Sequence, residues 1–336
     1  MKRPLRACLS LALAAALFLG CGAPRPAPLS PESDALMAFY ADNGPAADAA
    51  HVRALEAAAK GDLDALNAWR EGLLRPADET AFNAAHAGKV TLSMEGPWVV
   101  YAPAVKPVAT VIYLHGGGWA VGDARLCEDF CAGLAEQAGV EVWSLNYPLV
   151  PEHPFPETPR YVAERVRALR GRFADRPLFV AGDSAGGNLA VAAALLAPGQ
   201  ADGLILAYPA LDLGAKAEPE HAQYGDILAL TDALMTAFGR LYVDAETAAK
   251  DPVASPLVAD DAALRALPPV LTLAAECDVL AGQSRRFHAR LAGLGRTGDA
   301  RHVVPGAVHG FLSFPTLKEA QADALDAAAG WIRARL

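Results

Sequence analysis

The most informative motif of the chain is GDSAGG at residues 182–187. An apolar run at 177–182 precedes it and predicts a buried strand, and an Ala-rich segment at 185–196 follows it and predicts a helix. The motif contains the pattern G-x-S-x-G, in which a serine sits on a sharp strand-to-helix turn that requires small neighbours. We therefore predict that Ser184 is a nucleophile, the alternative being a glycine-rich turn that only caps a helix.

Strands and helices alternate on both sides of this motif. Before it, we expect a helical layer at about 33–87, strands at 90–94, 97–101, 108–114 and 140–145, and helices at 124–138 and 158–171. After it, we expect strands at 203–208, 269–275 and 300–305, a mostly helical insertion at about 214–245, and helices at 281–294 and 316–335. Strands separated by helices predict an α/β fold with a mainly parallel sheet covered on both faces.

A second glycine-rich stretch, HGGGW at residues 115–119, follows the expected strand that ends at Leu114. Its three glycines let backbone N–H groups point into a site without side chains in the way. Together with the N–H of Ala185, these amides are suited to bind the oxyanion of a tetrahedral intermediate. His115 is expected to fix the loop rather than to transfer protons. A phosphate-binding loop is the alternative, but the pattern G-x-x-x-x-G-K-[ST] is not present in the sequence.

A serine nucleophile needs a base, and the base needs an acid that orients it. His309 lies in GAVHGF at residues 306–311, after the last expected strand, where an imidazole can reach the carboxyl edge of the sheet. His302 lies inside that strand and His288 inside a helix, so packing or surface roles are predicted for both. His153 precedes the serine, whereas the order serine, acid, histidine is the one expected with this kind of serine turn. We therefore predict His309 as the base.

Asp278 is the predicted acid because it follows the expected strand 269–275 and lies between Ser184 and His309 in the chain. Glu276 is expected to point elsewhere. Asp212, just past the expected strand 203–208, is the alternative, since an acid at the end of an earlier strand can also reach the histidine.

Composition excludes several functional classes. The chain has 336 residues, of which 53% are hydrophobic and 20% charged, so it has ample material for a large core. Its net charge of −9 argues against a surface that binds nucleic acid through phosphates. Five cysteines are too few for a disulfide scaffold, and Cys127, Cys131 and Cys277 are expected to be buried. No metal or dinucleotide motif is found, so no cofactor is predicted.

The N-terminus has a pattern of its own. Three basic residues within 1–6 precede an apolar run at 7–19, which fits the core of a signal peptide and is too short to span a bilayer. The stretch LFLGC at 17–21 resembles a bacterial lipobox, in which Cys21 is lipidated and becomes the mature N-terminus. We therefore expect a signal peptide at 1–20, a Pro-rich tether at 21–31 and an exported, membrane-anchored lipoprotein. The alternatives are a cleaved periplasmic or secreted protein and a protein that keeps this segment as an uncleaved anchor.

The chain resembles the hormone-sensitive-lipase-like esterases of the α/β-hydrolase superfamily over about residues 98–335. The resemblance rests on motifs in the same order and spacing: HGGGW, GDSAGG, NYPLVPEHPFP, DPVASPL, LPPVLTLAAECD and GAVHGF. It implies an α/β-hydrolase domain over 32–336, with a helical cap from about 32–88 and 214–245. The resemblance also assigns the family's functional residues, namely catalytic Ser184, Asp278 and His309, and oxyanion donors Gly116, Gly117 and Ala185.

This resemblance implies a carboxylic ester hydrolase that acts on small-molecule, short-chain esters through an acyl-enzyme. The alternatives are an amidase or peptidase of the same superfamily, and a non-catalytic ligand-binding protein on the same scaffold. Two departures from the family pattern stand out. Tyr147-Pro148-Leu149 replaces the usual Tyr-Arg-Leu, so an arginine is missing, and Gly282 stands where a second acid often follows the catalytic one.

Overall fold

The computed structural model describes residues 27–41, 44–74, 79–214, 219–225 and 230–336. The expected signal peptide and Cys21 therefore lie outside the described residues. No helix within the described ranges is long and apolar enough to cross a membrane.

A single 8-stranded sheet forms the centre of the molecule, in the order β1-β2-β4-β3-β5-β6-β7-β8. Its strands are β1 (Val90–Glu95), β2 (Trp98–Pro103), β3 (Thr110–Leu114), β4 (Glu141–Leu145), β5 (Leu178–Asp183), β6 (Gly203–Ala207), β7 (Val270–Cys277) and β8 (Ala300–Val308). Six neighbouring strands are parallel, namely β4, β3, β5, β6, β7 and β8, and β2 pairs antiparallel with both β1 and β4. Every residue of β3, β5 and β6 is buried, as expected for parallel strands covered on both faces.

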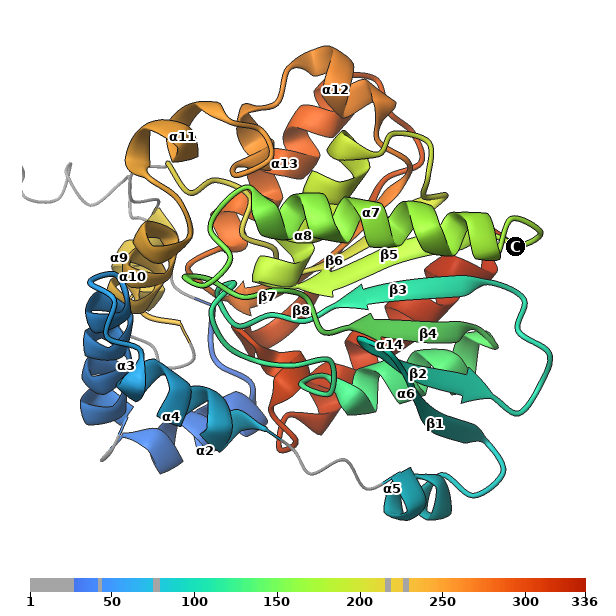
Figure 1. Cartoon of the computed structure of the whole chain (residues 1–336), viewed down its shortest axis with the longest axis horizontal. Coiled ribbons are helices and arrows are strands. Elements are labelled where there is room, and N and C mark those ends of the chain that lie inside the picture. The colour runs from blue at the N-terminus through green and yellow to red at the C-terminus, as the bar shows by residue number, and fades with distance from the viewer. Residues whose placement is uncertain (1–26, 42–43, 75–78, 215–218, 226–229) are drawn as a thin grey trace, which may run out of the picture.

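Helices cover both faces of this sheet and one of its ends (Figure 1). The described helices are α2 (Pro31–Tyr40), α3 (Gly44–Ala58), α4 (Asp64–Leu73), α5 (Glu79–Ala85), α6 (Glu128–Ala138), α7 (Glu157–Arg172), α8 (Ala185–Leu196), α9 (Pro219–Tyr224), α10 (Asp232–Tyr242), α11 (Ala245–Lys250), α12 (Asp261–Ala266), α13 (Ala281–Gly293) and α14 (Lys318–Arg333). Helices α7, α8 and α13 lie on one face of the sheet, and α6 and α14 lie on the other. Helices α2, α3, α4, α9 and α10 gather beyond one end of the sheet.

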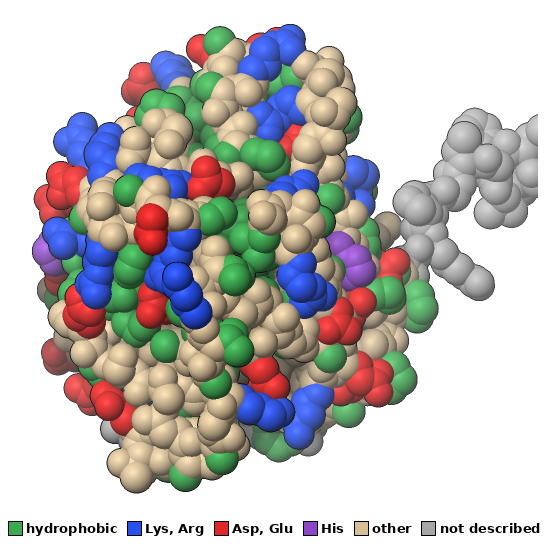
Figure 2. All heavy atoms as spheres, turned by 90° about the vertical axis from the view of Figure 1, so that its right-hand side faces the viewer, with side chains coloured by type: hydrophobic (Ala, Val, Ile, Leu, Met, Phe, Trp, Pro, Cys, Tyr) green, Lys and Arg blue, Asp and Glu red, His purple; other side chains and the backbone are tan. Residues whose placement is uncertain are grey.

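The surface at the opposite end of the molecule carries basic and acidic side chains intermixed, with no large area of one sign (Figure 2). Such mixing is ordinary for a solvated face.

Three details differ from the expected elements. The helix expected from 124 begins only at Glu128, because the Asp123 side chain accepts the N–H of Arg125 and holds this segment as a turn. The last strand extends to Val308, so His309 follows it directly. Helix α5, at the end of the segment expected to form the cap, packs instead against β1, and its Phe82 ring contacts Tyr101.

Candidate active site

Ser184 occupies a strained turn between β5 and α8. Its φ of 52° and ψ of −117° lie in a region that non-glycine residues rarely adopt. The turn is possible because its neighbours lack side chains: a Cβ on Gly182 would clash with the backbone of Gly186, and one on Gly186 would clash with the carbonyl of Leu114. The serine hydroxyl is thereby held at the carboxyl end of the central strand.

The structure brings Ser184, His309 and Asp278 into one chain of hydrogen bonds. The Ser184 hydroxyl donates to His309 Nε2 at 2.9 Å, and His309 Nδ1 donates to Asp278 Oδ2 at 2.8 Å. Both His309 and Asp278 are buried, 7% and 2% exposed respectively. The other carboxylate oxygen of Asp278 accepts the N–H of Leu280 at 2.9 Å, so this acid is oriented without a second acid at Gly282.

The structure places the alternative residues away from this chain of hydrogen bonds. Asp212 forms an ion pair with Arg286 at 3.0 Å. His302 bonds to Asp323 on α14, His288 bonds to Thr272, and His153 lies on the surface beside Glu157. Glu276 points elsewhere, as expected, and accepts the N–H of Gly306 at 2.8 Å.

The HGGGW loop passes beside the serine, but one of its amides is already used. The N–H of Gly116 donates to the Asp183 carboxylate at 2.8 Å. The expectation that Gly116 donates to an oxyanion is therefore wrong in this structure. Among the described residues, the N–H groups of Gly117, Gly118 and Ala185 donate to no protein acceptor and border the same cavity. This places the free amides one residue further along the loop than the motif suggested.

Asp183, which precedes Ser184, is a fully buried acid that the sequence analysis did not single out. Besides Gly116, the hydroxyl of Tyr113 donates to it at 2.9 Å, and the Cys127 thiol and the Tyr208 hydroxyl approach it at 3.6 and 3.4 Å. Burial raises its pKa, and these hydrogen bonds oppose the rise. The Tyr208 hydroxyl also accepts the N–H of Leu312, so Asp183 connects the glycine-rich loop to the segment that follows His309.

His115 fixes the loop, as expected. Its Nδ1 donates to the Gly116 carbonyl at 2.7 Å, and its ring stacks on Tyr147, whose hydroxyl donates to the His115 carbonyl at 2.6 Å. Burial lowers the pKa of His115 to about 4, so the imidazole is neutral at pH 7.

A cavity of about 470 Å³ opens over Ser184 and is closed by residues from two distant segments. Trp69 and Leu73 of α4 line it, as do Leu234 and Phe238 of α10, so its wall is mainly apolar. The Phe238 ring lies so close to Gly118 that a Cβ there would clash with it. A deeper ring, that of Tyr242, stacks on Trp119 with centroids 4.2 Å apart. Helix α10 therefore packs directly on the glycine-rich loop.

The three described cysteines are buried and free, as the sequence analysis predicted. Burial raises the pKa of each thiol, most strongly for Cys127 and Cys131. Within the described residues, no group of three or more His, Cys, Asp or Glu side chains is arranged to hold a metal ion.

The chain belongs to the family of proteins with the alpha/beta hydrolase fold, whose model matches residues 111–313. Ethyl acetate hydrolase of Pseudomonas putida is 32% identical over 223 residues, which cover 63% of this chain and 68% of that relative. An esterase of Acinetobacter venetianus is 31% identical over 186 residues, which cover 54% of this chain and only 60% of the relative. A solved hyperthermophilic esterase of Pyrobaculum calidifontis superposes with a TM-score of 0.72 at 28% identity, covering 92% of this chain and 99% of that one. The predicted fold class is thus confirmed.

Proposed function

We propose that this protein is a serine carboxylesterase that hydrolyses short-chain esters through an acyl-enzyme. The observation that carries the proposal is the uninterrupted chain of hydrogen bonds from the Ser184 hydroxyl through His309 to Asp278. The similarity to an ethyl acetate hydrolase and to other esterases supports the choice of ester bonds.

In the proposed reaction, Ser184 Oγ attacks the ester carbonyl while His309 Nε2 takes the hydroxyl proton. The tetrahedral intermediate collapses, the bond to the alcohol oxygen breaks, and His309 delivers the proton to the leaving alkoxide. Water then attacks the acyl-enzyme with the same base, releasing the carboxylic acid and restoring the serine. Asp278 keeps His309 in the tautomer that presents an unprotonated Nε2 and stabilises the imidazolium that forms.

The oxyanion of each tetrahedral intermediate is proposed to accept the N–H groups of Gly117, Gly118 and Ala185. These amides are fixed before the reaction, so they need no reorganisation as charge develops on the carbonyl oxygen. One such donor contributes about 2.7–4 kcal/mol to transition-state stabilisation.

The preference for short acyl chains is proposed from the closure of the cavity. Helices α4 and α10 act as a cap, and Trp69 and Phe238 stand over the serine with ring centroids 5.8 Å apart. A cavity of about 470 Å³ accommodates a small ester more readily than a triglyceride. We expect kcat/KM for p-nitrophenyl esters to be highest between acetate and hexanoate and to fall towards laurate. Efficient hydrolysis of an emulsified long-chain triglyceride would contradict this preference.

Two assays separate this proposal from its alternatives. Turnover of p-nitrophenyl butyrate, compared with that of butyryl p-nitroanilide, separates an esterase from an amidase. Covalent labelling by a fluorophosphonate separates both enzymes from a ligand-binding protein. We expect rapid ester turnover, slow or no anilide turnover, and one label per chain on Ser184.

For the N-terminus, we propose that Cys21 is the lipidated first residue of the mature protein and that residues 21–31 tether the catalytic domain to a membrane. Residues 1–20 carry three positive charges and no negative ones, so their removal moves the net charge from −9 to −12. Such a protein is repelled by an anionic lipid surface, so attachment has to come from the lipid, and one acyl chain anchors only marginally. Fractionation of wild type and Cys21→Ser in a bacterial host tests this. A wild-type protein that is soluble and starts after residue 23 would contradict it.

A further inference from the structure

We propose that Arg70, on the cap helix α4, is a positioning residue that holds the glycine-rich loop in the conformation that binds the oxyanion. The inference rests on the proposed function, because it concerns the loop amides of that same site. Arg70 does not line the cavity over Ser184, so it acts through the loop and not on the substrate.

The guanidinium of Arg70 reaches two backbone segments, the turn that follows Trp119 and the loop at Val150. Its Nε donates to the carbonyl of Ala120 at 2.8 Å, and its Nη2 donates to the carbonyl of Val150 at 2.8 Å. The two terminal nitrogens also bind the two oxygens of Glu152, at 2.5 and 2.9 Å. A fifth bond joins Nη1 to the side chain of Asn67. This arrangement uses the rigid, planar fork that only arginine provides.

The loop that Arg70 contacts is conformationally unusual. Gly117, Gly118 and Trp119 have φ values of 105°, 57° and 60°, all in the left-handed region, and Trp119 is not a glycine. Such a backbone persists only where its surroundings determine it strongly. The N–H groups of Ala120 and Val121 close the turn on the Gly117 carbonyl at 3.1 and 3.0 Å.

A second bond ties this turn to the neighbouring segment, since the N–H of Val150 donates to the Trp119 carbonyl at 3.0 Å. Arg70 joins the same two segments a second time, because it donates to the carbonyls of Ala120 and Val150. On α4, Trp69 directly precedes Arg70, and Gly72 and Leu73 follow it. All three of these residues line the cavity. The Arg70 side chain therefore fixes both the position of α4 and the turn that presents the Gly117 and Gly118 amides.

Lysine and alanine substitutions test the role of the fork. Lysine keeps the positive charge but cannot bind Ala120 O, Val150 O and Glu152 together. We expect Arg70→Lys to lower kcat for p-nitrophenyl acetate about 10-fold and Arg70→Ala about 100-fold, because a small misplacement of catalytic groups costs up to this much. KM should change less than kcat, since the loop amides bind the oxyanion most strongly in the transition state, whereas the cavity wall on α4 contacts the bound ester throughout. Added guanidinium should restore part of the kcat of Arg70→Ala.

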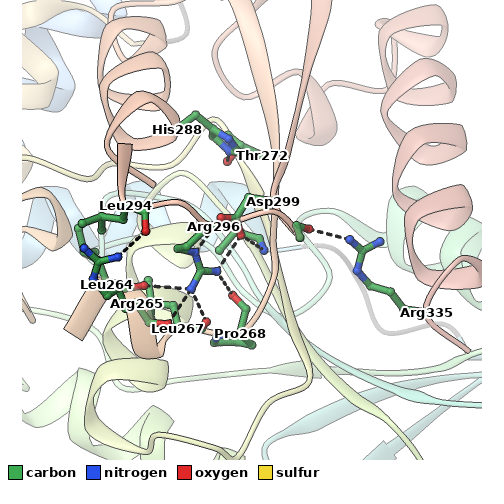
Figure 3. A network of polar contacts seen from close by, with 12 residues as sticks. Leu264, Arg265, Leu267, Pro268, Thr272, His288, Leu294, Arg296, Asp299 and Arg335 are labelled. Atoms are coloured by element: carbon green, nitrogen blue, oxygen red, sulfur yellow. Dashed lines mark hydrogen bonds and ion pairs between the residues drawn. The ribbon is translucent and has the colours of Figure 1, made fainter. Parts of the chain in front are cut away.

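A matched control comes from another arginine that also binds backbone carbonyls and a carboxylate. Figure 3 shows Arg296 with its nitrogens directed at Asp299 and at carbonyls of the segment 264–268, next to the amino-terminal end of β7 and so away from the carboxyl edge that holds the site. Arg296→Lys should lower Tm without changing kcat. Glu152→Gln, which weakens the ion pair and leaves the carbonyl contacts of Arg70, should lower kcat by less than about threefold.

The outcomes separate cleanly. Folded Arg70 variants with kcat within twofold of wild type would overturn the positioning role. So would an Arg296→Lys variant that loses kcat in the same proportion to its Tm as Arg70→Lys, because general destabilisation would then explain both. An inactive wild-type protein would remove the proposed function and this inference with it, whereas an active wild type with unaffected Arg70 variants would remove the inference alone.

Discussion

The carboxylate of Asp183 accepts the backbone N–H of Gly116, with 2.8 Å between Gly116 N and Asp183 Oδ1. Asp183, the residue that precedes Ser184, thus holds the glycine-rich loop that faces this serine. Tyr113, from the neighbouring strand β3, donates to the same carboxylate oxygen. The relative position of Ser184 and the glycine-rich loop therefore depends on one buried acid.

Asp183→Asn tests this dependence. Gly116, Tyr113 and Cys127 all donate to Asp183 Oδ1, and an amide oxygen in that place still accepts from them, but more weakly because it carries no charge. The amide NH2 group then replaces Oδ2, so the buried Tyr208 hydroxyl loses its acceptor. We expect kcat to fall about 10- to 100-fold and the free energy of unfolding to fall by about 2 kcal/mol, since a buried donor loses its partner. Ester turnover and urea unfolding measure the two effects. A variant with unchanged kcat would show that the loop holds its shape without this acid.

The assignment of the acid is tested by two matched substitutions. Asp278→Asn should lower kcat by about 10⁴-fold, because an amide at this position favours the wrong imidazole tautomer. Asp212→Asn should leave kcat within about threefold of wild type, because Asp212 pairs with Arg286 and does not contact His309. A larger loss in the Asp212 variant would move the acid to that residue.

Gly118 and Phe238 are expected to be coupled. Gly118→Ala introduces a Cβ that clashes with the Phe238 ring, at a φ of 57° that disfavours side chains. We expect this variant to lose at least about 10-fold in kcat, and Phe238→Ala in the same background to restore part of it. Phe238→Ala alone should raise kcat/KM for octanoate relative to acetate, because the cavity wall retreats. Strictly additive effects of the two substitutions in a double-mutant cycle would contradict the contact.

Burial of His115 predicts a loss of stability in acid. The folded protein holds this imidazole neutral, with a pKa of about 4, whereas the unfolded chain takes up a proton near pH 6.5. Stability from this group is therefore complete above about pH 6.5 and is lost as the pH falls towards 4. The contribution of His115 to the free energy of unfolding changes by roughly 3 kcal/mol across this pH range. Urea unfolding at pH 7.0 and 4.5 measures this change. Between these pH values, the free energy of unfolding of His115→Gln should fall less steeply than that of wild type.

If the free energy of unfolding of His115→Gln depends on pH as steeply as that of wild type, other groups cause the acid destabilisation. His288 provides an independent comparison, since burial also lowers its pKa to about 4 and it lies on α13, where it bonds to Thr272. His288→Gln should flatten the slope as well, by less than His115→Gln because its ring is partly exposed.

The sequence predicted the sheet and the serine turn because both depend on local patterns. An apolar run before GDSAGG and a helix after it leave few other conformations for Ser184. The order of Ser184, Asp278 and His309 along the chain then selected the residues that the structure brings together.

The remaining contacts depend on which segments meet in space. HGGGW indicates a loop of free amides but not that Gly116 is used by Asp183, which requires knowing that the two loops adjoin. Arg70 lies in a segment that shows only helical periodicity, and Phe238 in an insertion with no motif. The loop that contains Pro148 and Val150 is held through the Val150 carbonyl by Arg70 of α4. Only long-range packing assigns these residues a role.

Hydrolysis of p-nitrophenyl butyrate by purified wild type and Ser184→Ala tests the central claim most directly. The Ser184 side chain is half-buried and borders the cavity over the site, and loss of its hydroxyl opens no core cavity, so the variant should fold with an unchanged Tm. The account predicts that its kcat falls by at least about 10³-fold, because removal of the nucleophile leaves only binding and the loop amides to act. A folded Ser184→Ala variant that retains more than a few per cent of wild-type turnover would contradict the account.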